Sequence, residues 1–527
     1  MTYQFLDGAD IGNPSDKTLT LKTLQRTGKN GGTITVPPVE FGYHMRPNRV
    51  ESDGDKIVPL TRPRINTITT ETGAITTVTL SGPECVRGSK MPKAEDDNSL
   101  SCYPVYWPAN GGDPQLDWFH KYNAISVSTS DPAGQNEAVE NSYTYENPGW
   151  HYNDDPFTPE DERTWSSWRG YRKVTIYTGD TRHPQSKTVR QYMQGMHGDK
   201  RLNTTTTRTA VVPGIDVAGL DVSDATDYDQ YAGFLRQELT YNGTEPVSVT
   251  VNNIWGKETA SQQRPYAHTK AYFIRTGRTY AYTYLPISNT WRRSYTSHTY
   301  DNTYGLVTQT EAIGDQAKTG DETCTRVWYA RNPDKGLTSL VSRTRVIGSA
   351  CLDSAGADIT DDKLNLPANS KTRGDVLSDA AVVYDDAAAT GWSASQTPTR
   401  GIATWTGRAK AYPAAISTND RTPALNGGWQ TVTKTTYDTL GRPLGITDAK
   451  GNATTTTYYP AAAGPLTSTV VAAPKLASNG QSHKTYTYVD PARGSVTSTL
   501  DANVKKTENT YDGTVTFKRL GRRVDGG

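Results

Sequence analysis

The stretch Tyr437–Arg442, which reads Tyr-Asp-Thr-Leu-Gly-Arg, decides the fold of this chain. It is followed by Asp448–Asn452, which reads Asp-Ala-Lys-Gly-Asn, and by a threonine run that ends at Tyr458. A weaker copy lies downstream, and its corresponding positions are Tyr488, Gly494, Asp501 and Tyr511. A period of roughly 20 residues is typical of stacked supersecondary units rather than of an active site. The sequence therefore predicts a repeated structural unit.

Each marked position of the repeat has a physical reason. Gly441 and Gly451 stand where a reversing chain needs a positive φ, which only glycine adopts without a steric penalty. Asp438, Asp448 and Asn452 flank these glycines, and their short polar side chains can hydrogen-bond to the turn backbone. The threonines and tyrosines between the turns suit a pleated, half-buried strand. Each unit is predicted to be a strand, a turn and a returning strand.

The residues from Tyr437 to Tyr458 resemble the tyrosine-aspartate (YD) repeat of bacterial Rhs proteins, which also occurs in teneurins and in the C component of toxin complexes. That repeat has the approximate pattern Tyr-Asp-x-x-Gly-Arg, then Asp-x-x-Gly-Asn and a return to Tyr. The resemblance is weaker upstream, where degenerate openings are Tyr300-Asp301 with Gly305, Tyr329 with Gly336, and Tyr384-Asp385 with Gly391. A third start at Tyr511-Asp512 reaches Leu520-Gly521-Arg522 after an insertion. The first 300 residues carry no repeat that aligns.

The resemblance implies an all-β protein, a YD-repeat hairpin array that forms part of a curved sheet or hollow shell, with an irregular β-rich N-terminal region. We expect three regions: 1–227 (β-rich), 228–430 (degenerate repeats) and 431–527 (YD repeats). In the family such a shell encloses a C-terminal toxic domain. The resemblance implies that this chain is a non-catalytic shell segment whose partners are the remainder of the shell and an effector domain. Neither the terminal core region nor an effector is identifiable, so we expect a fragment.

Composition agrees with a β-rich architecture that is wetted on both faces. Only 34% of the 527 residues are hydrophobic, which is low for a chain of this size built around ordinary cores. Tyrosine, with 31 residues against 7 phenylalanines, is the aromatic side chain that can bury its ring and keep its hydroxyl hydrated or bonded. The 46 glycines and 30 prolines provide many chain reversals.

Charge and hydropathy exclude two classes of partner. The net charge of +1 argues against general nucleic-acid binding, which needs a basic surface. No apolar run is long enough for a membrane-spanning helix. The N-terminus lacks the pattern of a secretory signal. The resemblance nonetheless implies a secreted or cell-surface protein, so we expect either that export is signalled elsewhere or that this chain lacks its natural beginning.

The four cysteines fall into two local pairs, Cys85 with Cys102 and Cys324 with Cys351. Three pairings are formally possible, and local closure is the simplest of them. Disulfides would suit an extracellular protein with a thin core. Four free thiols in a cytosolic protein are the alternative.

No catalytic motif is present, and we expect neither an enzyme nor a bound metal or cofactor. One polar cluster offers many oxygen ligands, of the kind that calcium prefers; it consists of His151, Asn153, Asp154, Asp155, Glu160, Asp161 and Glu162. It lacks the spacing of a calcium loop and contains two prolines, so a plain surface loop is the favoured interpretation. The short acidic turn formed by Glu51, Asp53 and Asp55 is interpreted in the same way.

Trp165 and Trp168 are candidates for stacking on a sugar, and cell-surface glycans are the alternative partner. The competing interpretation is that both rings pack against the alternating segment 173–178. An extracellular carbohydrate-binding or adhesion module is thus the second hypothesis for function. Two further local expectations are a short helix over Tyr228–Leu239, where apolar residues fall at near-helical spacing, and loops or domain boundaries near 213–227 and 352–380.

Overall fold

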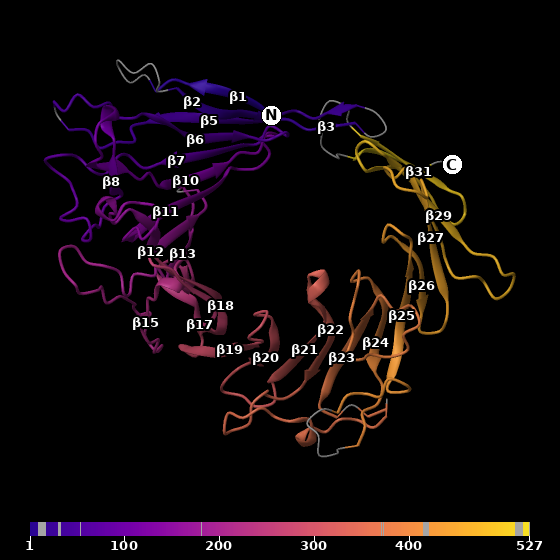
Figure 1. Cartoon of the computed structure of the whole chain (residues 1–527). Coiled ribbons are helices and arrows are strands. Elements are labelled where there is room, and N and C mark those ends of the chain that lie inside the picture. Colours follow the sequence, from indigo (N-terminus) through magenta and orange to yellow (C-terminus); the bar gives the residue numbers. More distant parts are fainter. Residues whose placement is uncertain are drawn as a thin grey trace. The chain divides into compact units, whose positions relative to one another are not determined.

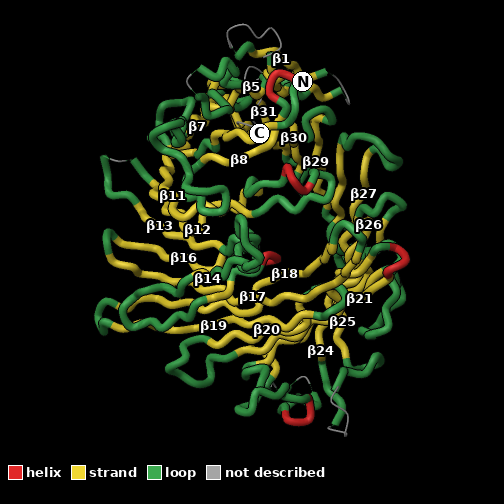
Figure 2. The backbone as a smooth tube through the Cα atoms, turned by 60° about the vertical axis from the view of Figure 1, so that its left-hand side comes forward, coloured by secondary structure: helices red, strands yellow, loops and turns green. Residues whose placement is uncertain are grey.

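The computed structural model describes residues 1–8, 17–29, 33–52, 54–180, 182–369, 371–372, 374–414, 421–511 and 520–525, the last segment as backbone only. Asp53, Asp512, Lys518, Arg519 and the C-terminal glycines lie outside the described residues, so the acidic turn and the third repeat start are described in part. The protein is all-β, as predicted (Figure 2). The helices of the described part are 3₁₀ turns of three residues each, η1 (Ala109–Gly111), η2 (Glu160–Glu162), η3 (Asp229–Tyr231), η4 (Pro333–Lys335) and η5 (Asp361–Lys363).

Contacts divide the chain into two compact units: unit 1 comprises Met1–Arg26 and Val36–Arg293, and unit 2 comprises Thr27–Thr35 and Ser294–Gly527. The three regions expected from the sequence, 1–227, 228–430 and 431–527, stay a prediction.

Unit 1 contains an antiparallel sheet in which each strand pairs with the next sheet strand along the chain (Figure 1). Its strands are β1 (Thr2–Leu6), β2 (Thr18–Leu24), β5 (Val39–Arg46), β6 (Arg62–Thr69), β7 (Ile75–Leu80), β10 (Ala124–Thr129), β11 (Val139–His151), β12 (Ser167–Thr178), β13 (Ser186–Tyr192), β16 (Leu235–Asn242), β17 (Glu245–Gln263) and β18 (His268–Leu285). Two small hairpins, β8 (Cys102–Trp107) with β9 (Gln115–His120) and β14 (Val211–Val212) with β15 (Ala225–Thr226), are separate from it.

Unit 2 continues the same meander pattern within itself, and the division between the units falls inside β19. Figure 1 shows its strands following one another in a single curved layer. They are β19 (Thr290–Tyr300), β20 (Val307–Ile313), β21 (Thr323–Asn332), β22 (Leu337–Ile347), β23 (Val376–Tyr384), β24 (Ala403–Ala409), β25 (Trp429–Tyr437), β26 (Pro443–Asp448), β27 (Ala453–Tyr459), β28 (Ser468–Ala472), β29 (Lys484–Asp490), β30 (Ser495–Leu500), β31 (Lys506–Tyr511) and β32 (Leu520–Asp525). The short hairpin of β3 (Thr27–Gly28) and β4 (Ile34–Thr35) also belongs to unit 2.

The predicted repeat forms successive hairpins of one sheet. β25 pairs with β26 in a register that sets Tyr437 opposite Pro443, and β26 pairs with β27. In the second copy β29 pairs with β30, and β30 with β31. No residue of β26 or β27 is fully buried. This part of the sheet is wetted on both faces, as the low apolar content predicts.

Loops that fold onto the sheet supply much of the apolar core. In unit 2, Leu364 and Leu366 from the loop between β22 and β23 pack against Ile347. Ala389 and Trp392, from the loop between β23 and β24, belong to a second cluster that includes the strand residues Ala381, Val383, Trp405 and Trp429. In unit 1, Ile215 and its neighbours cover β13, β16 and β17. The segments expected to be loops near 213–227 and 352–380 therefore carry core residues, and the second of them enters β23 at Val376.

The helix predicted over Tyr228–Leu239 is wrong. The structure has a single 3₁₀ turn, η3, followed by Gly233 at φ +84° and by β16 from Leu235. β16 pairs with β13 on one side and with β17 on the other. The backbone hydrogen bonds to these two neighbouring strands stabilise the strand more than the weakly helical spacing of apolar residues would stabilise a helix, because tertiary contacts override intrinsic propensity.

Candidate functional site

The first candidate site is the turn that joins β25 to β26. Asp438 Oδ1 accepts hydrogen bonds from the backbone N–H groups of Leu440 (2.9 Å) and Arg442 (2.8 Å), and Oδ2 accepts one from Arg442 Nε (2.6 Å). Burial opposes ionisation of this carboxyl, but the three donors lower its pKa on balance. Gly441 has φ +81°. The guanidinium of Arg442 also lies 4.5 Å from the ring centroid of Tyr458.

The turn between β26 and β27 uses the same chemistry. Asp448 accepts hydrogen bonds from Lys450 N (2.8 Å), Asn452 N (2.9 Å) and Asn452 Nδ2 (2.9 Å), and these donors lower its pKa. Gly451 has φ +87°.

In the second copy, Asp501 closes the equivalent turn. It accepts hydrogen bonds from Asn503 N (2.9 Å) and Lys505 N (2.8 Å). Val504 takes the place of glycine and has φ +64°. These turns thus share an aspartate that binds the turn backbone and one residue at positive φ. In the second copy the residue at positive φ is Val504, whose branched side chain is strained there.

The sequence did not reveal what the repeated tyrosines bind. The hydroxyl of Tyr437 donates a hydrogen bond to the carbonyl of Ala403 on the preceding strand (2.8 Å). The same link to the preceding strand joins Tyr511 to Val496 (2.8 Å), Tyr384 to Val341 (2.7 Å), Tyr329 to Val307 (2.7 Å) and, in unit 1, Tyr43 to Leu21 (2.7 Å) and Tyr145 to Ala124 (2.5 Å). These tyrosines bind one hairpin to the previous one. Unit 1, which has no alignable repeat, uses the same link.

One degenerate opening forms the same turn, and a second keeps only the glycine at positive φ. After β19, Asp301 accepts the backbone N–H groups of Thr303 and Tyr304 (3.1 and 2.6 Å), and Gly305 has φ +63°. After β21, the turn through η4 ends at Gly336, with φ +70°.

In the third opening, which begins at Tyr384-Asp385, the turn glycine is not the one predicted from the sequence. Asp385 accepts four backbone N–H groups, from Thr399, Arg400, Gly401 and Ile402, at 2.7 to 3.0 Å. The glycine at positive φ is Gly401 (+72°), and Gly391 is not the turn glycine. Residues 386–398 are an insertion between the aspartate and its glycine, and such an insertion hides the spacing in the sequence.

A block of buried ion pairs lies on the loop-covered face of unit 2, and sequence reasoning missed it. Arg343 donates two hydrogen bonds to Asp379, from Nε (2.9 Å) and Nη2 (2.7 Å). Arg345 donates two to Asp361, from Nη1 (3.0 Å) and Nη2 (2.5 Å). All four side chains are at most 2% exposed. We call these four residues the ion-pair block.

The ion-pair block ties the covering loops to the strands. Asp379 also accepts the hydroxyl of Tyr412 (2.6 Å), and burial together with the charge of Asp379 raises the pKa of that tyrosine. Asp361 accepts the backbone N–H of Arg421 (3.0 Å). The guanidinium of Arg343 lies 4.4, 5.0 and 5.4 Å from the ring centroids of Trp328, Trp392 and Trp429.

The four cysteines form two disulfides, Cys85–Cys102 in unit 1 and Cys324–Cys351 in unit 2. Each lies in an apolar cluster, the first with Val50 and the second with Ile347. The first bridge links the loop at Cys85 to β8 of the β8–β9 hairpin, and the second links the loop at Cys351 to β21 of the sheet.

The two tryptophans proposed to stack on a sugar have different environments. Trp165 is 4% exposed, packs against Tyr152 and donates its indole N–H to the carbonyl of Lys200 (3.1 Å), so it offers no free ring face. Trp168 is half-buried and lines a pocket of about 440 Å³. Its ring is held at 4.6 Å from that of Trp150 and 5.0 Å from that of Tyr171.

The acidic cluster near η2 forms a loop whose polar side chains bind its own backbone. Asn153 accepts the N–H of Asp155 (3.1 Å), and Asp155 accepts the N–H of Phe157 (3.1 Å). His151 is buried, with Nε2 3.4 Å from Asp199. In the other acidic turn, Asp55 is paired with Arg49, whose hydrogen bond lowers the pKa of Asp55 against the effect of burial.

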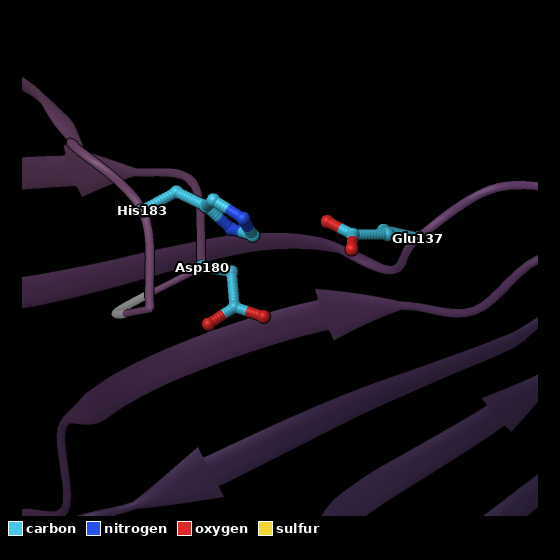
Figure 3. A group of neighbouring side chains, drawn as sticks. All are labelled: Glu137, Asp180 and His183. Carbon is cyan, nitrogen blue, oxygen red and sulfur yellow. The ribbon is translucent and has the colours of Figure 1, made fainter.

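Within the described ranges, one group of three His, Cys, Asp or Glu side chains has ligand atoms that all lie within 4.8 Å of one another: Glu137, Asp180 and His183 (Figure 3). Arg182 already donates to Asp180 from Nε (2.7 Å) and from its backbone N–H (2.8 Å), and these bonds lower the pKa of Asp180 to about 2. The carboxylate of Asp180 is therefore already paired with a guanidinium. No helix in the part of the chain that the structure describes is long and apolar enough to span a membrane.

No family model matches the sequence, and no curated protein matches it. Among solved structures, the crystal structure of TcdB2-TccC3 is similar over 97% of this chain and 29% of that chain, with 13% identity and a TM-score of 0.53. The structure of TcdB2-TccC3-TEV is similar over 95% of this chain and 26% of that chain, with 13% identity and a TM-score of 0.50. The Tc holotoxin pore of Photorhabdus luminescens, with a TccC3 mutation, is similar over 93% of this chain and 27% of that chain, with 12% identity and a TM-score of 0.51. The chain spans less than a third of these chains, and the likeness is one of fold.

Proposed function

We propose that this chain is a wall segment of a YD-repeat shell of the Rhs and toxin-complex type, which encloses or presents a toxin or a surface effector. The observation that carries the proposal is the recurring hairpin unit of unit 2, in which an aspartate closes the turn and a tyrosine hydroxyl binds the preceding strand. The likeness to toxin-complex structures over 97% of the chain supports it.

The chemistry of the wall suits containment. Each strand gains its backbone hydrogen bonds from its two neighbours, so a sheet of this kind grows by adding hairpins and needs no opposing sheet. Strands such as β26 and β27 bury no residue fully, so they can face water on both sides. In this proposal the chain has no catalytic role of its own and holds neither metal nor cofactor.

The proposed partners are the remainder of the shell and an enclosed C-terminal effector domain. The match covers 29% of the TcdB2-TccC3 chain, so a protein of that length would have room for the rest of a shell and for an effector domain. The proposed location is outside the cell or at its surface, where the two disulfides would persist.

The direct test is protection from protease. The chain is expressed together with the coding sequence that adjoins it, and trypsin digestion of the polypeptide encoded downstream is timed. Containment predicts that this polypeptide is cut much more slowly than the same polypeptide made alone, and that the difference disappears once urea unfolds the wall. Equal digestion rates in native buffer would contradict containment.

Sedimentation of the isolated chain gives a second test. A sheet with unpaired edge strands is prone to pair with other chains, so the wall segment alone is expected to oligomerise or aggregate. A strictly monomeric, cooperatively folding chain would instead favour a self-contained module.

A further inference from the structure

The pocket beside Trp168 in unit 1 has the composition of a ligand site. Its volume of about 440 Å³ lies in the range of small-molecule sites. The aromatic rings of Tyr145, Trp168 and Tyr171 line it together with Lys121 and Asn123. The rings of Tyr145 and Tyr171 lie 4.7 Å apart, so the aromatic wall is fixed by its own packing.

Two cations line this pocket: Arg169 is paired with Asp229 (2.8 Å), and Lys121 has no carboxylate partner among the described residues. Arg46 and Arg64 lie beside Tyr122, another residue of the lining. Lys121 Nζ lies 5.3 Å from the ring centroid of Trp168 and donates a long hydrogen bond (3.4 Å) to the carbonyl of Tyr122. The guanidinium groups of Arg46 and Arg64 lie 5.8 and 5.9 Å from the ring centroid of Tyr122. The Nε atoms of both arginines are buried without a hydrogen-bond partner among the described residues, while Arg64 Nη2 donates a hydrogen bond to Asn48 Oδ1 (2.6 Å).

The electrostatics of the pocket favour an anion. Burial, and secondarily the charge of Arg64, lowers the pKa of Lys121. Charges gathered in a partly desolvated site repel one another, and an incoming carboxylate would relieve that repulsion. Hydrogen bonds between an ammonium and a carboxylate are also among the stronger ones in proteins.

The polar groups beside the rings suit hydroxyls. Tyr171 Oη lies 2.7 Å from both Ser101 Oγ and Asn123 Nδ2, so a small hydrogen-bonded network borders the aromatic wall. Pyranose rings present C–H groups on one face and hydroxyls around their edge. A ring stacked on Trp168 would place its edge against this network.

We propose that this pocket binds a carboxylate-bearing sugar, such as a uronic acid residue of a glycan, with the ring on Trp168 and the carboxylate at Lys121. This assignment goes beyond the containment role, and its failure would leave that role untouched. It also moves the sugar-stacking surface from the tryptophan pair of the sequence hypothesis to Trp168 with Lys121, because Trp165 is buried.

The test is isothermal titration calorimetry of the full chain with a tetramer of galacturonic acid and with its methyl ester. The ester keeps the rings and removes the charge. The acid is expected to bind at least tenfold more tightly than the ester, which corresponds to about 1.4 kcal/mol. Equal affinity for the two, or no binding of the acid at millimolar concentration, would overturn the proposal.

Two variants locate the site. Lys121→Met is expected to weaken binding of the acid at least tenfold. Lys187→Met is the matched control, because Lys187 Nζ also lies over an aromatic ring of unit 1, that of Tyr241 at 4.1 Å, and does not line this pocket. Unchanged affinity in Lys121→Met, or an equal loss in both variants, would overturn the assignment. Complete competition by acetate at equal concentration would indicate a simple carboxylate site and would refute recognition of the sugar ring.

Discussion

Asp379 is the residue whose removal should reveal how unit 2 is held together. In Asp379→Ala, the guanidinium of Arg343 stays in a site where it is 0% exposed and loses both of its carboxylate hydrogen bonds, and Tyr412 loses its acceptor. Removing one partner of a buried ion pair costs about 3–5 kcal/mol. We expect unit 2 to lose that much free energy of unfolding.

The double variant separates a buried-charge penalty from lost packing. In Arg343→Met with Asp379→Leu, both charges go and apolar volume remains among Trp328, Trp392 and Trp429. Replacing a whole buried pair by apolar residues is often neutral or stabilising. The double variant is therefore expected to be more stable than Asp379→Ala.

The assay is urea denaturation followed by hydrogen exchange of the β22 and β23 peptides, which reports on the strands that carry the pair. Glu508→Ala is the control, because Glu508 forms an exposed pair with Lys506 in the same unit, with side chains 52% and 51% exposed. Such pairs contribute roughly 0–1 kcal/mol. The reasoning is refuted if Asp379→Ala lowers the free energy of unfolding by no more than this control does. It is also refuted if the double variant is no more stable than Asp379→Ala.

Three further changes test the turns, the acid response and the disulfide. Val504→Gly should stabilise the chain by about 1 kcal/mol in urea titrations, because a β-branched residue at φ +64° is strained and glycine recovers most of that cost; a loss of stability would contradict the assigned turn. Burial opposes ionisation of Asp361, but the hydrogen bonds from Arg345 and Arg421 outweigh it and lower the pKa of this carboxyl. The ionised Asp361 therefore stabilises the fold fully at pH values above its unfolded pKa of about 3.8, and this stabilisation is lost as the pH falls through the lower folded pKa. The urea midpoint of the wild type should therefore fall more steeply from pH 5 to pH 2 than that of Asp361→Asn, and parallel curves would count against it. Replacing Cys324 and Cys351 by alanine removes a cross-link across 27 residues and should cost about 3.5 kcal/mol, and unchanged unfolding of the variant would show that the bridge contributes nothing.

The hairpins of Tyr437–Tyr458 could be predicted because their signal is local. All the contacts of such a turn lie within five residues. At Asp448, for example, the carboxylate accepts backbone N–H groups two and four residues further on, and Gly451 between them has a positive φ. The same signal failed at Asp385, where the insertion before Gly401 separates the two groups. Tyr228–Leu239 failed for a different reason, since its neighbours in the sheet decide its conformation.

The ion-pair block could not be predicted, because its partners are far apart in the sequence. Arg343 and Asp379 are separated by 36 residues, and nothing in either strand marks the side chain that is covered. The difference between Trp165 and Trp168 has the same origin. They are three residues apart, and only the packing of Tyr152 on one and the pocket beside the other distinguish a core residue from a surface one.

The ion-pair block also shows how a chain with 34% hydrophobic residues packs loops onto a single sheet layer. A single layer has no opposing sheet to bury either face, so loops must cover a face wherever it is not left wet. Loops are rich in polar groups, and a buried polar group needs a partner. Buried arginines meet this need: Arg421 donates to the loop carbonyls of Leu364, Leu366 and Pro413, while Arg343 and Arg345 hold the carboxylates. Buried arginine in unit 2 takes the place that aliphatic side chains hold in a two-layer core. Unit 2 should accordingly be more sensitive to loss of a single charge than to loss of a single methyl group.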